Sequence, residues 1–228
     1  MLNKLYFTTF VYSLLLTLFS TVLPSNSFGA GKFFTKIPKP IKTISISETK
    51  IQLLIDSNDI PYRKSKRDSV QFIPEMYAFN IGHCGGKNIS PNIKWKILSE
   101  NKIDTIKSYA VTMYSPNSNT GSGWWHWIVH GIPASVNEIE TGTSKFGEKE
   151  IINSEGEVVG VTEVTDSNNF GYSGPCPLIN SLWQEYIFTV YALNVKSLPV
   201  SDRFCSQAMI RASILKHTIA STSLKGYY

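Results

Sequence analysis

Residues 121–133 have the sequence GSGWWHWIVHGIP, and this run holds three of the five tryptophans of the chain. Glycines bound this short run on one side and a proline on the other. Its alternation predicts a β-strand with Trp125, Trp127 and Val129 on one face and His126, Ile128 and His130 on the other. Taken alone, the run also fits an aromatic core strand that carries an incidental histidine.

The composition is that of an ordinary folded protein. The chain has 228 residues, of which 42% are hydrophobic and 17% are charged, with a formal net charge of +5. Basic residues cluster only at 63–67, and Asp68 follows at once. A nucleic-acid surface needs a broader basic stripe with exposed aromatic residues, so we expect no nucleic-acid partner.

The N-terminus resembles an export signal. Lys4 precedes an apolar stretch from Leu5 to Leu23, and Ser27-Phe28-Gly29 places small residues before a cleavage point. We expect a signal peptide over 1–29, a mobile spacer over 30–49 and one domain over 50–228, in an exported protein that is periplasmic or secreted. An uncleaved membrane anchor is the alternative, because the apolar stretch approaches the ~20 residues that span a bilayer.

The three cysteines are Cys84, Cys176 and Cys205. An odd number in an exported chain allows at most one internal disulfide and leaves one thiol over. No cysteine or histidine spacing fits a zinc site, so no metal is expected, and no cofactor is predicted either. Cys176 is interpreted as a buried thiol.

Most of the chain predicts strands and turns. Strands are expected at 51–55, 108–114, 185–193 and 218–224, besides the tryptophan strand. One helix is expected near the C-terminus, with Ser201 as N-cap and with Phe204, Ala208, Ile214 and Leu215 on its buried face. The fold class is therefore mainly β, an antiparallel β-sandwich with one or two short helices.

Four blocks of sequence in this order resemble the phosphatidylethanolamine-binding protein family, in its bacterial Raf-kinase-inhibitor-like branch of YbhB and YbcL. They are residues 84–95 (CGGKNISPNIKW), 124–127 (WWHW), 168–177 (NNFGYSGPCP) and 186–193 (YIFTVYAL). The ending from His217 to Tyr227 is similar to the closing strand of that family. The resemblance covers about residues 50–228.

The resemblance implies a β-sandwich with a small pocket at one end that takes an anion or a phospholipid head group. His126 matches the pocket histidine and Tyr186 a pocket tyrosine, both expected to donate hydrogen bonds to an anionic oxygen. The Gly-Pro wall is expected to bring backbone N–H groups close to the ligand. The complete set of predicted ligand-binding residues is His126, Tyr186, Gly174, Pro175, Cys176, Trp124, Trp127, Ser115, Asn117 and Gln184.

The chain departs from the family pattern at two places. Ser115-Pro116-Asn117 stands where the family usually has Asp-Pro-Asp, and Gln184-Glu185-Tyr186 stands where it usually has His-Arg-Tyr. Losing the two carboxylates removes groups that would hold a histidine charged or bind an ammonium. The pocket is therefore expected to be partly degenerate.

Three functions remain open from the sequence. The first is an exported binding protein for a small anion or phospholipid head group. The second is an interaction module with a protein partner, of the protease- or kinase-inhibitor type, which no longer uses its pocket. The third is a hydrolase that reuses the pocket. The absence of a Gly-x-Ser-x-Gly or His-Glu-x-x-His motif makes a non-enzymatic role the expectation.

Overall fold

The protein was analysed as a computed structural model that describes residues 51–64, 69–98, 104–179, 181–200 and 205–228. The expected signal peptide and spacer lie outside these residues, as do the expected N-cap Ser201 and most of the basic cluster. The division into signal, spacer and domain therefore stays a prediction.

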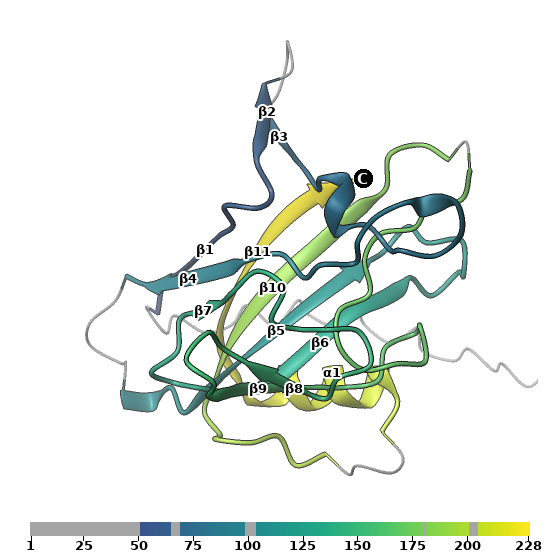
Figure 1. Cartoon of the computed structure of the whole chain (residues 1–228). Coiled ribbons are helices and arrows are strands. Elements are labelled where there is room, and N and C mark those ends of the chain that lie inside the picture. The colour runs from purple at the N-terminus through teal and green to yellow at the C-terminus, as the bar shows by residue number, and fades with distance from the viewer. Residues whose placement is uncertain (1–50, 65–68, 99–103, 180, 201–204) are drawn as a thin grey trace, which may run out of the picture. The chain divides into compact units, whose positions relative to one another are not determined.

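Two β-sheets and one α-helix make up the described part of the chain (Figure 1). The larger sheet has eight strands in the order β2 (Tyr62–Lys64), β3 (Ser69–Phe72), β11 (Thr218–Tyr227), β10 (Glu185–Leu193), β5 (Ser108–Ser115), β6 (Trp124–Pro133), β9 (Val158–Thr162) and β8 (Glu150–Ile152). The smaller sheet consists of β1 (Leu53–Asp56), β4 (Ile93–Ile97) and β7 (Glu138–Ile139). Two short 3-10 helices, η1 (Glu75–Tyr77) and η2 (Gly82–Cys84), lie between β3 and β4. Every described strand pair is antiparallel except β3 with β11, so the predicted β-sandwich with a late helix is confirmed.

The main hydrophobic core lies between the two sheets. Trp127 and Phe188 of the larger sheet are fully buried there, together with Ile93 and Trp95 of the smaller one. Burying a side chain of this size contributes about 1.5–3 kcal/mol relative to leaving it exposed. This core therefore fixes which face of β6 and β10 points inward.

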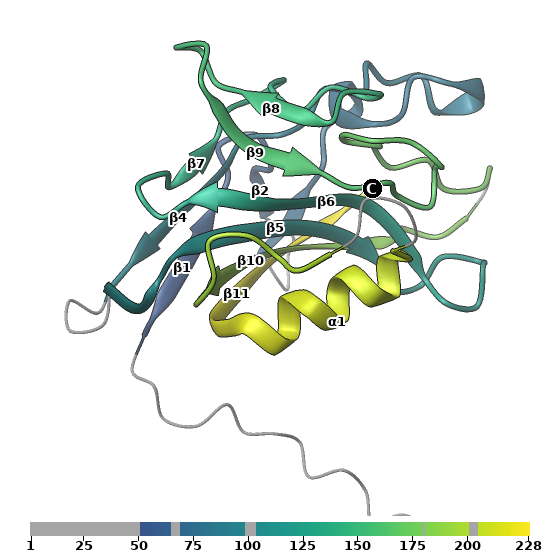
Figure 2. The same ribbon diagram turned by 90° about the horizontal axis from the view of Figure 1, so that it is seen from below.

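A second, smaller core lies on the opposite face of the larger sheet, under the helix α1 (Gln207–His217) (Figure 2). Ile210 and Ile214 stand four residues apart on one helix face and pack against Ile128 of β6. Arg211 lies over the Trp125 ring at 5.9 Å from its centroid.

The predicted start and buried face of the helix are wrong in part. The N-cap is Ser206, whose hydroxyl accepts from the Met209 amide, and the helix begins at residue 207. Of the predicted buried residues in the described range, Ile214 is buried, whereas Ala208 and Leu215 are exposed. Apolar residues occur all around this helix, so their spacing alone does not select the buried face.

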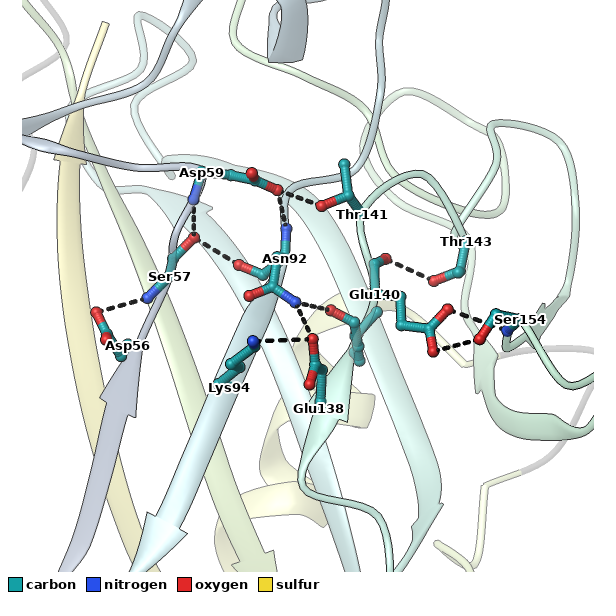
Figure 3. A network of polar contacts seen from close by, with 11 residues as sticks. Asp56, Ser57, Asp59, Asn92, Lys94, Glu138, Glu140, Thr141, Thr143 and Ser154 are labelled. Atoms are coloured by element: carbon teal, nitrogen blue, oxygen red, sulfur yellow. Dashed lines mark hydrogen bonds and ion pairs between the residues drawn. The ribbon is translucent and has the colours of Figure 1, made fainter.

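A polar network joins the smaller sheet to the neighbouring loops (Figure 3). Asn92 is at its centre: its amide N–H donates to Asp59 at 2.7 Å, and its side-chain nitrogen donates to Glu138 at 2.6 Å and to the Ile139 carbonyl at 3.0 Å. Its carbonyl oxygen accepts from the Ser57 hydroxyl. Since buried polar groups are costly unless they are paired, these bonds hold the loop before β4 in place.

Among the described residues, no helix has the length and the apolar character that crossing a membrane requires.

Candidate functional site

A cavity of about 670 Å³ opens at the end of the larger sheet where β5 stops and β6 and β10 begin. Loops that are far apart in sequence form its walls, and a smaller hollow of about 360 Å³ shares Pro177 and Leu178 with it. The lining residues are Phe79, Ile81, Ser118, Asn119, Thr120, Trp124, His126, Phe146, Asp166, Ser167, Ser173, Gly174, Cys176, Pro177, Leu178, Gln184 and Tyr186.

A β-bulge turns His126 toward this cavity. In the β5–β6 register Tyr114 pairs with Trp125 and Met113 with Trp127, so His126 is the extra residue. The predicted alternation holds from Trp127 to Val129 but is wrong before it: Trp125 packs on the helix side with Ile128, whereas His126 and Trp127 both lie on the other side. Such a bulge re-aims a side chain that regular pleating would have placed on the opposite face.

The tautomer of His126 follows from its hydrogen bond. Nδ1 lies 2.8 Å from the Ser173 carbonyl oxygen, which can only accept, so Nδ1 carries a hydrogen. Burial lowers the pKa of His126 to about 4, although hydrogen bonds to the backbone oppose the shift, and the ring is neutral near pH 7. In this neutral ring Nε2 is the unprotonated nitrogen, and the hydrogen bond expected from the histidine to an anion stays a prediction.

Tyr186 stands beside this histidine. The two rings meet edge to face with centroids 5.1 Å apart, and Tyr186 is only 1% exposed. Its hydroxyl donates to Gln184 over a long 3.4 Å contact, which a ligand would readily replace. Burial raises the pKa of the phenol, so Tyr186 stays protonated.

The Gly-Pro wall is tightly packed. A Cβ on Gly174 would lie 2.1 Å from the Tyr77 carbonyl oxygen, so only glycine fits at this place. The Gly174 amide donates to the Asn88 side chain at 2.7 Å, and the Ser173 amide donates to the His126 carbonyl at 3.0 Å. The protein itself uses the Gly174 amide, and the expected approach of the wall's N–H groups to a ligand stays a prediction.

Cys84 and Cys176 form a disulfide, and Cys205 is free. The limit of one disulfide with one thiol left over is confirmed, whereas the interpretation of Cys176 as a buried thiol is wrong. The bond joins η2 to the cavity wall across 92 residues of sequence. It fixes the wall on which Gly174 lies.

Six of the ten predicted site residues line the cavity: His126, Tyr186, Gly174, Cys176, Trp124 and Gln184. The other four are not among its lining residues. Trp127 is fully buried and donates to the Ser144 hydroxyl at 2.8 Å, and Pro175 is buried behind the wall. Asn117 is exposed on its loop. Ser115 is fully buried, and its hydroxyl has no partner within the described residues.

Asp166 is the main residue that sequence reasoning missed. Its carboxylate lines the cavity and accepts from the Trp125 amide at 2.8 Å, while its own amide donates to the Trp125 carbonyl at 3.2 Å. The cavity thus has a carboxylate despite the loss of Asp-Pro-Asp, supplied by the loop after β9. Ser167 and Ser173 lie beside it, with hydroxyls 2.6 Å apart. No motif marks Asp166, because only the folded chain brings it next to the residue that precedes His126.

Comparisons with known proteins agree with the predicted resemblance. The profile of the phosphatidylethanolamine-binding protein family matches residues 63–228. The UPF0098 protein YbhB of Escherichia coli K12 is 33% identical over 156 residues, which cover 68% of this chain and 91% of YbhB. YbcL of the same organism is 33% identical over 155 residues, which cover 67% of this chain and 78% of YbcL.

Solved structures give the same result. The crystal structure of E. coli YbcL, described as a new member of the mammalian PEBP family, matches with a TM-score of 0.65 at 28% identity, covering 77% of this chain and 97% of that one. The PEBP homologue CT736 from Chlamydia trachomatis shares the fold, with a TM-score of 0.57 at 22% identity, and covers 77% of this chain and 96% of its own. The chain therefore belongs to the phosphatidylethanolamine-binding protein family, in the branch of YbhB and YbcL.

Proposed function

We propose that the protein is an exported, non-enzymatic binding protein that holds a small polar ligand of the phospholipid head-group class in the end cavity. The observation that carries this proposal is the buried ring of His126, which lines the cavity and is held in place by the bond between its Nδ1 and the Ser173 carbonyl. Tyr186 stands beside it with a weakly held hydroxyl. Two polar groups that converge in a partly apolar cavity are typical of small-ligand sites.

The size of the cavity supports the proposal. Its volume of about 670 Å³ falls within the roughly 300–1,000 Å³ that is usual for such sites. Phe79 and Phe146, whose rings stack edge to face at 5.4 Å, give it an apolar wall.

Exposed apolar side chains next to the cavity support a ligand with an apolar tail. Leu178 is 61% exposed and belongs to the cavity wall, and Leu182 and Trp183 of the adjoining hollow are 88% and 68% exposed. Contiguous exposed apolar groups are uncommon on soluble proteins unless they contact something, and tryptophan is enriched at lipid–water interfaces. The alternative, a protein partner, would use the same side chains without the cavity.

The hydrogen bonds of His126 support a non-catalytic role. In a hydrolytic triad a carboxylate orients the ring nitrogen that does not face the nucleophile. Here Nδ1 is bonded to a backbone carbonyl, and the nearby Ser167 and Ser173 hydroxyls are bonded to each other. The disulfide between Cys84 and Cys176 supports export, because such bonds persist in oxidising compartments.

The test is calorimetric titration of the purified protein with O-phosphoethanolamine, and separately with vesicles that contain phosphatidylethanolamine. Tyr186→Phe removes one hydrogen bond and is expected to weaken binding about threefold to tenfold. Tyr191→Phe is the matched control, because Tyr191 lies on the same strand but in the helix-side core.

The two arms separate the sources of the ligand. Binding of vesicles but not of the soluble compound would assign the ligand to a lipid, and the reverse result to a free metabolite. Equal affinities of Tyr186→Phe and the unmodified protein would contradict the proposal. Binding in neither arm at millimolar concentration would also contradict it and would favour the protein-partner role, and steady hydrolysis of either compound would contradict the non-enzymatic role.

A further inference from the structure

His83, Cys84 and Cys176 come together at the wall between the cavity and the adjoining hollow. One ring nitrogen of His83 and the two sulfur atoms lie within 4.8 Å of one another. The sulfur atoms are joined as the disulfide. Two thiolates and an imidazole are also the ligands that Zn²⁺ and other thiophilic metal ions prefer. Opening the disulfide therefore turns the same three groups into a set of metal ligands.

The orientation of His83 is that of a metal ligand. Its Nε2 lies 2.7 Å from the Pro177 carbonyl oxygen. A carbonyl oxygen only accepts, so Nε2 carries a hydrogen and Nδ1 is the ring nitrogen left for an ion. A metal-binding histidine almost always donates its other ring N–H to a carbonyl, a carboxylate or a water, which fixes the direction of the ring. The loop that carries Cys176 thus also holds His83 in place.

The disulfide borders two openings. Cys176 belongs to the lining of the cavity, whereas His83 and Cys84 belong to the lining of the hollow of about 360 Å³. His83 is exposed. Among the described residues that line the hollow, none is a lysine or an arginine that would repel a cation. A small reductant and a metal ion therefore have a route to this group.

We propose that reduction of the disulfide creates a site for one thiophilic metal ion of the Zn²⁺ class, bound by the two thiolates and by Nδ1 of His83. A dithiol reductant supplies the two electrons. One of its thiolates attacks Sγ of Cys176, the S–S bond breaks, and Cys84 leaves as a thiolate that takes up a proton. The second thiol of the reductant then displaces Cys176, which receives the proton of that thiol. The products are two cysteine thiols and the oxidised reductant, and binding of Zn²⁺ releases both thiol protons.

The bound ion would replace the covalent link between η2 and the cavity wall. Sequence spacing predicted no metal site, because Cys176 reaches the other two residues only through a contact across 92 residues. The metal site does not depend on the ligand of the cavity, which is measured on the oxidised protein. Its failure would leave the proposed function standing.

The test uses Cys205→Ser, in which Cys84 and Cys176 are the remaining cysteines. One sample stays oxidised, and another is reduced with a dithiol that is then removed without oxygen. Both are titrated with Zn²⁺ in competition with a chromogenic chelator, and their melting temperatures are measured with and without the ion. We expect one Zn²⁺ per reduced chain and none per oxidised chain. Zn²⁺ should raise the melting temperature of the reduced chain alone, because an ion that binds the folded state stabilises it.

Two histidine variants in the same background test the third ligand. His83→Ala should weaken Zn²⁺ binding by the reduced chain at least about tenfold, the effect typical of losing even a partner outside the ligand shell. His217→Ala is the matched control, since His217 is bonded to Asn194 and is not among the residues that line the hollow. Equal Zn²⁺ affinities of the two variants would overturn the role of His83.

A variant without the two thiols separates a built site from the mere loss of the disulfide. Cys84→Ser with Cys176→Ser, again with Cys205→Ser, lacks the covalent link and has no thiolate, so Zn²⁺ should neither bind it nor raise its melting temperature. Absence of Zn²⁺ binding by the reduced chain would overturn the proposal. Zn²⁺ binding that leaves the melting temperature of the reduced chain unchanged would also overturn it, because the ion would then bind unfolded chains equally well.

Discussion

His126 and Ser173 are joined by two hydrogen bonds: Nδ1–H of the ring donates to the Ser173 carbonyl at 2.8 Å, and the Ser173 amide donates to the His126 carbonyl at 3.0 Å. This pair joins the strand β6 to the wall loop and fixes the ring tautomer. The chemistry of the cavity depends on it, because it decides which ring nitrogen a ligand meets.

The lowered pKa of His126 predicts that the protein becomes less stable as the pH is lowered from about 6.5 toward 4. The folded pKa is about 4 and the ordinary value is 6.5, so between these values the unfolded chain binds a proton that the folded chain does not. The stabilisation contributed by the neutral ring of His126 is fully present above about pH 6.5 and is lost as the pH falls toward 4. We expect His126 to lower the free energy of unfolding, measured with urea, by about 2–3 kcal/mol between pH 7.5 and pH 4.5. In His126→Gln, only the decrease caused by the other titratable groups should remain. The same pH slope in both proteins would show that His126 is not the group responsible.

The disulfide predicts a large effect of reduction. Closing a loop of this length contributes about 4–5 kcal/mol in the chain-entropy description, and removing a native disulfide typically costs 2–5 kcal/mol. The double variant Cys84→Ser with Cys176→Ser should therefore lose about 2–5 kcal/mol in denaturant unfolding. Cys205→Ser is the control and should change little, because Cys205 is free. An unchanged unfolding midpoint of the double variant would contradict the structure.

The network of Figure 3 predicts that Asn92 is a stabilising residue. Asn92→Ala removes the side-chain bonds to Glu138 and Ile139 in a buried place, and should cost about 1–3 kcal/mol. Asn117→Ala is the control because Asn117 is exposed, and it should change neither stability nor ligand affinity. A measurable loss of affinity in Asn117→Ala would instead return that residue to the site.

Packing at Gly174 predicts that this position does not accept a side chain. Gly174→Ala places a Cβ against the Tyr77 carbonyl, which already accepts from the Tyr172 hydroxyl at 3.0 Å. The wall must move, and a loss of at least about 2 kcal/mol is expected from overpacking. Thermal unfolding of Gly174→Ala measures it, and a melting temperature equal to that of the unmodified protein would contradict the packing described here.

The fold class could be predicted from the sequence because some elements have an unambiguous pattern. The strand predicted at 185–193 has these bounds in the structure, because nearly every residue in it is buried and apolar. Three of the four family blocks contribute lining residues to the cavity, and the fourth, residues 84–95, contains the start of β4. The bulge at His126 was not predicted, because a strict alternation of faces assumes that each residue of the strand has one partner on the neighbouring strand.

The rest of the site required the fold itself. Asp166 comes next to Trp125 only through a contact across 41 residues of sequence. Three cysteines allow three pairings, and only the fold selects Cys84 with Cys176. The use of the Gly174 amide by Asn88 depends on a contact across 86 residues, which no local pattern encodes.

The most direct test of the central claim is an NMR titration of ¹⁵N-histidine-labelled protein with O-phosphoethanolamine at pH 7.5. Of the four histidines, His130 and His217 are internal controls for His126, whereas His83 is bonded to Pro177 of the cavity wall. We predict an Nδ1-protonated His126 in the free protein, and a saturable shift of its Nε2 while His130 and His217 stay unchanged. No shift of His126 at millimolar ligand, or equal shifts of His126, His130 and His217, would contradict a ligand site in this cavity.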